Sequence, residues 1–402
     1  MKKLFSIRLS NFFTSKSFNL LLFTFVFFLG KIEITNAQSA FGSNNLAIVV
    51  AAASASNTTC SVVEINKTSA SQTAIQTIAV PGTGTNAIRV SGSATSTLYA
   101  SNTNDGSLFC FTGHNKDTVT TINANTILPR AVVTVNASGV VAIQTTYTGT
   151  SGQQTRGATS INNTNWYIGD QAGFYTNNAT SASPAGNIRS VKAFGGTVYA
   201  MTSTSSSTVG IISATSGGTY TALSGLPTTS PSTGGAKQDF YLISSGSNGS
   251  TFDVLYILSG TSSTDTIWKY SLVSGSWNSN GTYVGAGAFG LAAEKFGTGA
   301  NLYKTTGSGA TTANSVIKLF DAAGYNATIN ITTANNVTLY TAATGTIIKG
   351  IAFAPKALLP VVTAGSPSGN YGTAFSYNIS ATNTPTSYAI SSGTLPSGLT
   401  LN

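Results

Sequence analysis

Charged side chains are scarce in this sequence. Only 7% of the 402 residues are Asp, Glu, Lys or Arg, and there is a single histidine. Such a chain must stay soluble through Ser, Thr, Asn and Gly, which give a neutral, hydrogen-bonding surface. The basic residues beyond the N-terminal segment are scattered singly, so the phosphate attraction that nucleic-acid binding needs is missing. Nucleic acid is therefore excluded as an expected partner.

Residues that could bind a metal or act in nucleophilic catalysis are also scarce. The lone His114 stands in TGHNKD, and the only soft ligands beside it are Cys60 and Cys110, so no zinc centre is expected. No G-x-S-x-G phrase could supply a serine partner for His114, which we expect to be solvated in a polar loop. The sequence predicts no cofactor, no metal and no catalytic residue.

Long hydrophobic runs are confined to the N-terminus. Basic residues precede an apolar run over residues 20–29, and Thr35-Asn36-Ala37 follow. About ten apolar residues span only about half a bilayer as a helix, so residues 1–37 are predicted to be a secretory signal peptide cleaved between Ala37 and Gln38. No other apolar run is long enough for a membrane span in the mature chain. We expect a protein that is secreted, extracellular or held at the cell surface, from a Gram-negative bacterium.

Removal of that segment changes the charge balance. Five basic residues and one acidic residue leave with it, so 14 basic and nine acidic residues remain and the net charge falls from +9 to +5. The remaining chain is rich in Ser, Thr and Gly, but 41% hydrophobic and 10% aromatic residues are ample for a packed core.

A short phrase recurs along residues 45–355. Each copy has a strand-like run, a few turn residues, a run ending in apolar-Tyr-apolar, and a third apolar run. The copies are IRVSGSATSTLYASN (88–102), RGATSINNTNWYIGD (156–170), NIRSVKAFGGTVYAMTS (187–203), KQDFYLISSGSNGSTFDVLYILSG (237–260) and FGLAAEKFGTGANLYKTTG (289–307). A strand pair without the tyrosine, AVVTVNASGVVAIQ (131–144), is counted as one more unit. The anchor residues of these units are 26 to 57 residues apart, a range that brackets a four-stranded propeller blade.

The two ends of this region complement each other. NLAIVVAA (45–52) resembles a second strand without a first, and IIKGIAFAP (347–355) a first strand without a second. Joined, they form one blade, which closes a ring and leaves no open sheet edge. With the six other units this predicts an all-β fold, a seven-bladed β-propeller over residues 38–355. Irregular spacing disfavours a β-helix, ungrouped runs disfavour a string of β-sandwiches, and no helical period supports a βαβ fold.

Cysteine usage fits this arrangement. Cys60 and Cys110 fall in the third runs of neighbouring units, so we expect them to remain beyond bonding distance and to be dispensable for folding.

The pattern changes at Lys356, and residues 356–370 are predicted to be a linker. The remaining residues, 371–402, contain GTAFSY, PTSY and LPSGLTL. These phrases resemble the immunoglobulin-like domain of bacterial surface proteins over about 40 residues, which implies a partial β-sandwich module, cut off within the domain. Residues 39–355, through NIRSVKAFGGTVY, FDAAGYNATI and GIAFAP, resemble a group of secreted, propeller-like bacterial proteins with no assigned activity.

Three sets of residues bear on possible binding or catalytic sites. GAGAFG (285–290) matches G-x-G-x-x-G but lacks the following helix and acidic residue, so a loop is favoured. NTNDGS (102–107) is out of register for calcium and fits a hairpin turn. Carboxylates that could converge for glycoside hydrolysis are Asp170, Asp239, Asp253, Asp265, Glu294 and Asp321, although nothing in the sequence pairs them.

Tryptophans are the remaining candidates. Trp166 and Trp268 lie in repeat strands and are expected to pack between blades. Trp277, in the loop-like SGSWNSNG, is the candidate ligand-binding residue. The sequence thus favours a non-enzymatic extracellular binding or adhesion protein with a glycan or surface protein as partner. The alternatives are a secreted polysaccharide hydrolase with carboxylates at one propeller mouth, and a passive matrix or stalk component.

Overall fold

The computed structural model describes residues 38–117, 122–202, 209–212, 219–227, 236–307, 313–363, 365–370, 372–383 and 385–401. The predicted signal peptide and the Ala37 side of its cleavage site lie outside these residues. Among the described residues no helix is long and apolar enough to cross a membrane.

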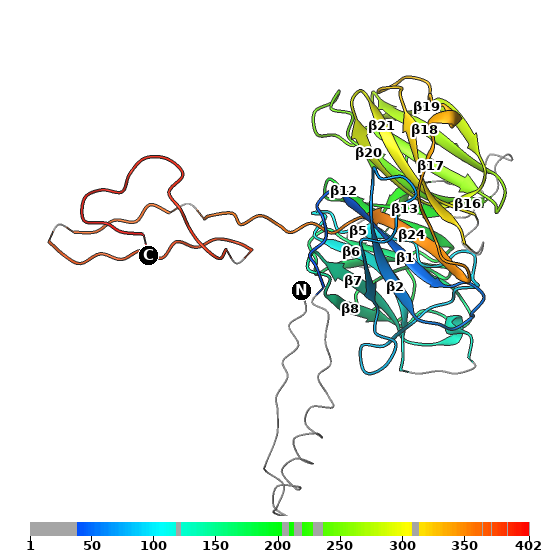
Figure 1. The fold of residues 1–402 in the computed structure, drawn as a ribbon, viewed down its shortest axis with the longest axis horizontal. Helices are drawn as coiled ribbons and strands as arrows, with labels where there is room; N and C mark the ends of the chain where they lie inside the picture. Colours follow the sequence, from blue (N-terminus) through cyan, green and yellow to red (C-terminus); the bar gives the residue numbers. More distant parts are fainter. Residues whose placement is uncertain are drawn as a thin grey trace, which may run out of the picture. The chain divides into compact units, whose positions relative to one another are not determined.

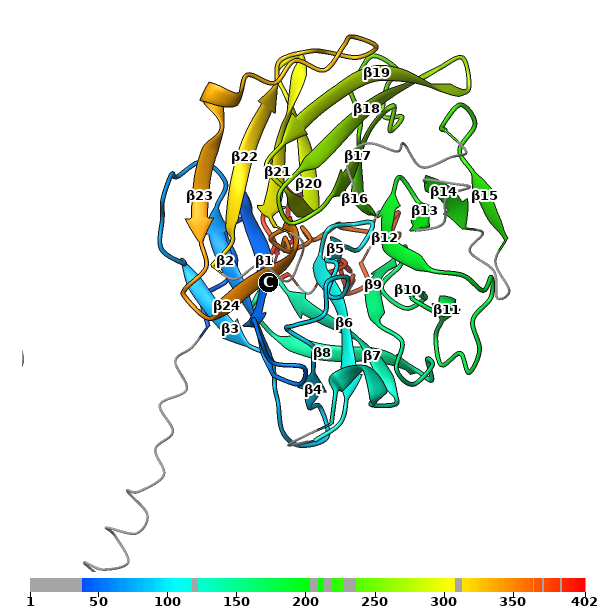
Figure 2. The same cartoon turned by 90° about the vertical axis from the view of Figure 1, so that its right-hand side faces the viewer.

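Six antiparallel sheets, which we call blades 1 to 6, make up the folded part of the chain (Figure 2). Blade 1 is closed by strands from both ends of the region, in the order β24 (Thr346–Phe353), β1 (Asn45–Ala52), β2 (Cys60–Asn66) and β3 (Gln76–Ala79). Blade 2 contains β4 (Ile88–Arg89), β5 (Ser101–Asn102), β6 (Leu108–Asn115), β7 (Arg130–Asn136) and β8 (Val141–Tyr147). Blade 3 contains β9 (Thr155–Ser160), β10 (Trp166–Asp170) and β11 (Gly173–Thr176).

The second half of the ring is more regular. Blade 4 contains β12 (Ile188–Phe194), β13 (Thr197–Thr202), β14 (Val209–Ile212) and β15 (Tyr220–Ala222). Blade 5 contains β16 (Ala236–Ile243), β17 (Val254–Gly260), β18 (Asp265–Val273) and β19 (Ser276–Gly285). Blade 6 contains β20 (Ala288–Phe296), β21 (Gly299–Thr306), β22 (Ser315–Asp321) and β23 (Val337–Thr341). Two short 3-10 turns, η1 (Ala124–Thr126) and η2 (Thr333–Asn335), lie in connections.

The predicted closure is confirmed. β1 pairs antiparallel with β24, with Leu46 opposite Phe353 and Ala52 opposite Thr346, and Figure 1 shows the two strands side by side in blue and orange. Two strands that lie about 300 residues apart in the sequence thus share one ladder, and the sheets form a β-propeller.

The predicted blade count is wrong, because the structure has six blades rather than seven. The sequence predicts a separate unit at 131–144, but β7, within that segment, pairs with β6 along Leu108–His114 and so belongs to blade 2. The first phrase of blade 2 provides only the two-residue strands β4 and β5. The later strands β6, β7 and β8 build the rest of that sheet.

Burial decreases from the centre of the ring outward. Inner strands such as β9 and β24 are buried at nearly every position, whereas outer strands such as β15 and β23 are largely exposed. Between the blades lie six apolar clusters, one for each junction. Both faces of each sheet are therefore covered by neighbours, which a closed ring provides without a second layer.

The two cysteines illustrate this two-sided burial. Both are free thiols, with Cys60 packed in the core between blades 1 and 2 and Cys110 in the core between blades 2 and 3. Burial raises the pKa of the Cys60 thiol to about 12 and also raises that of Cys110. The thiols thus face different junctions.

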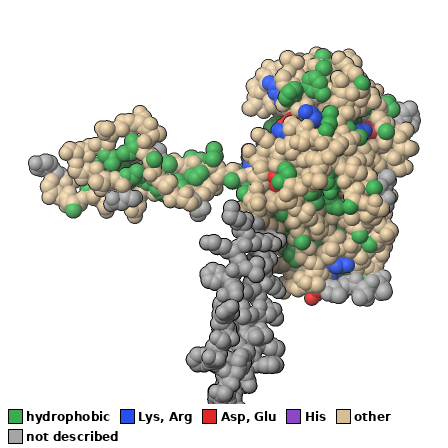
Figure 3. Space-filling model, in the orientation of Figure 1, with side chains coloured by type: hydrophobic (Ala, Val, Ile, Leu, Met, Phe, Trp, Pro, Cys, Tyr) green, Lys and Arg blue, Asp and Glu red, His purple; other side chains and the backbone are tan. Residues whose placement is uncertain are grey.

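The immunoglobulin-like module is not seen. Among the described residues between 356 and 401 the only pairing is an isolated bridge, Val362 to Ala381, and the alternating Phe375, Tyr377 and Ile379 are exposed. These apolar side chains are therefore only partly covered, and Figure 3 shows hydrophobic atoms at the surface of this terminal segment.

Candidate functional site

A pocket of about 430 Å³ opens at one mouth of the propeller, where four inner strands end. We call it the mouth pocket. The strand ends contribute Phe194 of β12, Tyr241 of β16, Glu294 of β20 and Phe353 of β24, and the turn at residues 102–106 completes the wall. Inner strands of a propeller converge on the axis, so side chains far apart in the sequence meet here.

A buried ion pair closes the floor. Lys192 Nζ lies 3.2 Å from Asp239 Oδ2 and donates to the carbonyl oxygens of Ala100 and Leu291 at 3.1 and 3.2 Å. Burial lowers the pKa of Lys192 and raises that of Asp239, and each partner opposes the other's shift. Because these contacts join blades 2, 4, 5 and 6, the centre of the ring is cross-linked instead of open.

Further along the axis the channel is filled by side chains. Tyr99 stacks on Phe289 with ring centroids 4.5 Å apart, and its hydroxyl donates to Gln238 Oε1 at 3.0 Å. Arg189 donates to the same two oxygens at 3.2 Å. The mouth pocket is thus a blind depression with a solid base.

Aromatic rings form one wall of the mouth pocket. The Phe194 ring lies 5.0 Å from Tyr241 and 5.4 Å from Phe252, and Tyr241 lies 6.0 Å from Phe353. Edge-to-face and tilted packing of this kind holds the rings in place. Phe252, Tyr241 and Phe353 remain partly exposed and can offer ring surface to a ligand.

Each carboxylate in the wall is already engaged. Glu294 binds Lys67 Nζ through Oε2 at 2.7 Å and accepts the Tyr303 hydroxyl at Oε1, also at 2.7 Å. Asp105 accepts hydrogen bonds from Thr103, Ser107 and Asn163. Burial alone would raise the pKa of Asp105, but those bonds outweigh it and lower the pKa.

Most of the predicted carboxylates lie away from the mouth pocket. Five of the six form ion pairs: Asp170 with Arg130, Asp265 with Lys304 and Asp321 with Lys269 elsewhere, Asp239 with Lys192 in the pocket floor, and Glu294 with Lys67 in its wall. Asp253 accepts from Ser245 and Asn248 beside its own hairpin. Glu294 is the one of the six that lines the mouth pocket, where it is joined by Asp105, which the sequence suggested only as a turn residue.

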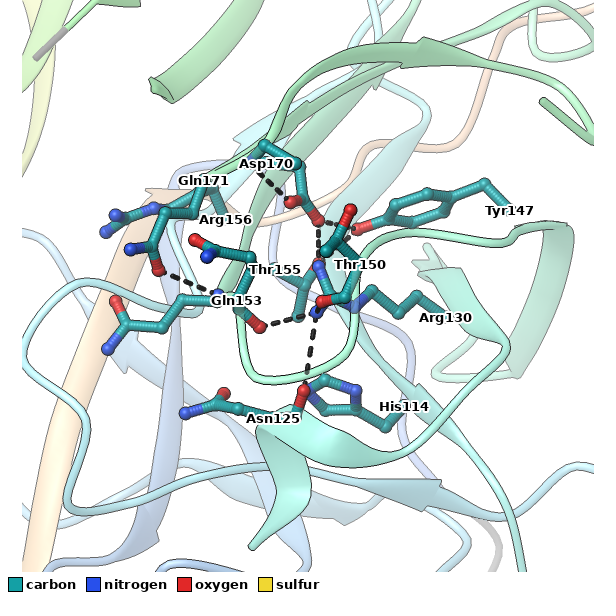
Figure 4. A network of polar contacts seen from close by, with 12 residues as sticks. His114, Asn125, Arg130, Tyr147, Thr150, Gln153, Thr155, Arg156, Asp170 and Gln171 are labelled. Atoms are coloured by element: carbon teal, nitrogen blue, oxygen red, sulfur yellow. Dashed lines mark hydrogen bonds and ion pairs between the residues drawn. The ribbon is translucent and has the colours of Figure 1, made fainter. Parts of the chain in front are cut away.

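His114 is not solvated, contrary to the prediction. It lies in β6 with 1% of its surface exposed, and Nδ1 is 3.0 Å from the carbonyl oxygen of Ile127 (Figure 4). Burial, and then the nearby Arg130 charge, lower the pKa of His114 to about 4. A neutral Nδ1–H donor therefore serves as a structural link within blade 2.

Arg130 stands beside His114 at the centre of a polar network (Figure 4). Its Nη1 pairs with Asp170 of blade 3, and Nη2 donates to the Thr150 carbonyl at 2.6 Å. Tyr147 donates its hydroxyl to the same Asp170 oxygen at 2.9 Å. The network binds blade 2 to blade 3.

The same combination recurs between blades 5 and 6. Asp321 Oδ2 is 2.8 Å from Lys269 Nζ and accepts the Tyr256 hydroxyl at 2.8 Å. In both cases Oδ1 of the aspartate accepts the backbone N–H two residues later, from Ala172 or Ala323. The sequence contains a signal for this arrangement that was not among the predicted motifs: D-x-A-G followed by an aromatic residue, at 170–174 and 321–325. We call each cation–Tyr–Asp set a junction lock.

Trp277 is not a loop residue. It belongs to β19, is 4% exposed, and packs in the apolar core between blades 4 and 5. It lines a second depression, beside Phe194 and Phe252, but not the mouth pocket. Trp166 and Trp268 pack in blade junctions as expected. No group of three metal-binding side chains is found within the described ranges.

The comparisons with known proteins identify no family. No family model matches the chain, and no curated protein matches it. Similar solved structures include TolB from Acinetobacter baumannii, at 12% identity over 79% of this chain and 68% of that chain, with a TM-score of 0.38. A candidate 6-phosphogluconolactonase from Bacteroides fragilis has 10% identity over 74% and 82%, with a TM-score of 0.40. A nidogen/laminin complex has 11% identity over 76% and 97%, also at 0.40. At these identities and scores the similarity bears on no function.

Proposed function

We propose that this chain is a non-enzymatic binding protein, secreted or displayed at the cell surface, and that its ligand is a glycan seated in the mouth pocket. The observation that supports this most is the blind, aromatic-walled pocket itself, which lies within the size range of small-ligand sites. Its solid floor rules out threading of a ligand through the ring, so a chain end or a side branch fits best.

The chemistry of the wall agrees with a sugar. Aromatic ring faces carry partial negative charge and attract the C–H groups of a sugar ring, while the neighbouring Ser and Asn side chains can exchange hydrogen bonds with hydroxyl groups. Ser43, Asn44 and Ser244 line the pocket and provide such side chains. The predicted signal peptide supports an extracellular site of action, and residues 371–402 would serve as part of an immunoglobulin-like spacer.

A secreted polysaccharide hydrolase is the second candidate, because Asp105 and Glu294 line one pocket. Glycosidases, however, need one carboxylic acid with a raised pKa. Hydrogen bonding lowers the pKa of Asp105, and both oxygens of Glu294 are held by Lys67 and Tyr303. Burial raises the pKa of Asp239 in the floor, but this carboxylate is 1% exposed, is paired with Lys192 and does not line the pocket. This pattern favours binding over hydrolysis. A passive stalk would need no such pocket.

A glycan array with the chain from Gln38 onward tests the proposal. Asn44→Trp places a large side chain at an exposed position of the pocket wall and should abolish glycan binding. Val284→Trp, on the outer strand β19 and 66% exposed, is the matched control and should bind normally. Binding that survives Asn44→Trp, or release of reducing sugar ends from a bound glycan, would overturn the proposal.

A further inference from the structure

Resting on the proposed function, we propose that the glycan is acidic. Its carboxylate groups, as in a uronic acid, pair with Lys295 and Lys356 at the rim of the mouth pocket while its rings lie against the aromatic wall. The inference starts from the charges that the pocket leaves uncompensated.

Four lysines line the pocket, and two of them are committed. Lys192 is bound to Asp239 in the floor, and Lys67 is bound to Glu294 in the wall. Lys295 and Lys356 also line the pocket and are exposed, and within the described part of the chain neither forms an ion pair. Asp105 also lines the pocket, and because its lowered pKa keeps it ionised it offsets one of these two charges. The pocket therefore keeps an excess of one positive charge that its own carboxylates do not balance.

The chain makes room for both of these lysines. A Cβ at Gly246 would lie 2.8 Å from Lys295 Nζ, and a Cβ at Gly106 would lie 3.0 Å from Lys356 Cε. The backbone of Lys356 is also fixed, because its N–H donates to the Gly106 carbonyl at 3.0 Å. The two ammonium groups therefore lie over glycine turns beside the pocket.

The pocket lysines lie near aromatic rings, and this narrows the class of ligand further. Lys67 Nζ lies 6.0 Å from the centre of the Phe353 ring, and Lys192 Nζ lies 5.3 Å from that of Tyr241, so cations and aromatic rings are neighbours in this pocket. A ligand that contacts both the rim lysines and the aromatic wall must combine carboxylates with C–H surface. A uronic acid carries a carboxylate and C–H groups on the same sugar ring. A neutral sugar has no carboxylate to pair with Lys295 and Lys356.

Equilibrium binding of two matched probes tests the inference. The probes are an α-1,4-linked galacturonate tetramer and the same tetramer with its carboxylates reduced to alcohols. The acidic tetramer should bind at least about tenfold more tightly at low salt, and its advantage should shrink as NaCl is raised because salt screens exposed charges. Equal affinities would overturn the inference.

Lysine variants locate the effect. Lys295→Gln and Lys356→Gln should each weaken binding of the acidic tetramer about fivefold and leave the neutral tetramer unchanged, while Lys116→Gln, an exposed lysine outside the pocket, should change neither. An unchanged affinity for the acidic tetramer in both pocket variants would overturn the inference. Binding of only neutral glycans, still abolished by Asn44→Trp, would refute the acidic ligand while leaving the proposed function in place.

Discussion

Asp170 and Asp321 are fully buried, and each is paired with a cation in its junction lock. Truncating one partner of a buried ion pair leaves the other as an unpaired charge in the interior, which costs far more than the intact pair contributes. The locks are therefore sites of high sensitivity and not large sources of net stability.

Asp170→Ala should lower the free energy of unfolding by about 3–5 kcal/mol, because Arg130 is left buried without its carboxylate. Asp321→Ala should lower the free energy of unfolding by a similar amount, because Lys269 is left buried without its carboxylate. Urea unfolding at pH 7 measures both. Lys116→Ala is the control, since Lys116 is exposed and its substitution should change stability by about 0.5 kcal/mol or less. A loss below about 1 kcal/mol at both locks would contradict their role.

Because His114 is buried, we expect the free energy of unfolding to depend on pH. Its pKa is about 4 in the folded chain and about 6.5 when unfolded, so the unfolded state binds more protons between these values. Stability should be constant with respect to this group above pH 6.5 and fall by about 3 kcal/mol as the pH drops to 4. In His114→Asn, which keeps a side-chain N–H near the Ile127 carbonyl, this part of the fall should vanish. Parallel stability curves for the two proteins over pH 4–6.5 would show that His114 is not held neutral.

Two errors at the residue scale have one physical cause. Trp277 and His114 stand among Gly, Ser, Asn and Lys, which by propensity indicate loops. In the structure, however, Trp277 pairs across from Leu272 and His114 across from Arg130. Strand pairing overrides local propensity here, even though Leu272 is only five residues from Trp277 and Arg130 only sixteen from His114. The mouth pocket escaped prediction for a different reason, since its residues come from different blades and meet only in the closed ring.

At the scale of strands and hairpins, sequence patterns performed well where a unit was complete. The hairpins around Tyr167, Tyr199, Tyr256 and Tyr303 all form as predicted. The count failed at blade 2, whose inner strands are short and whose Tyr99 lies outside any strand. Because the first half of blade 2 is irregular, its remaining strand pair at 131–144 resembles a separate unit in the sequence.

Residues 372–401 provide an element-scale prediction. Their backbone has almost no pairing among the described residues, and Phe375, Tyr377, Tyr388 and Ile390 are 37–47% exposed. We expect their amide hydrogens to exchange near the rate of an unstructured chain, while those of Ile347–Ile351 in β24 remain protected. Hydrogen exchange followed by mass spectrometry measures both in one sample. Comparable protection in the two segments would show that residues 372–401 fold by themselves.

For the whole molecule, ring closure is the property that stability depends on. A chain covering 38–360 keeps β24 and should unfold at the same temperature as 38–402. A chain covering 38–345 lacks β24, so it loses the inner strand of blade 1 and exposes the β1 edge, and we expect it to aggregate. Thermal unfolding and light scattering of the two proteins compare them directly. A soluble, cooperatively folded 38–345 protein would mean that closure is not required.

The β1–β24 ladder also sets how the ring responds to mechanical tension. A pull transmitted through the segments that flank the propeller reaches β1 at Asn45 and β24 at Phe353, and these positions lie at the same end of the ladder, where Leu46 faces Phe353. In this antiparallel geometry the load falls on one hydrogen-bonded pair at a time, so the seam peels open like a zipper instead of shearing as a unit. The propeller should therefore yield at low force, with blade 1 opening first.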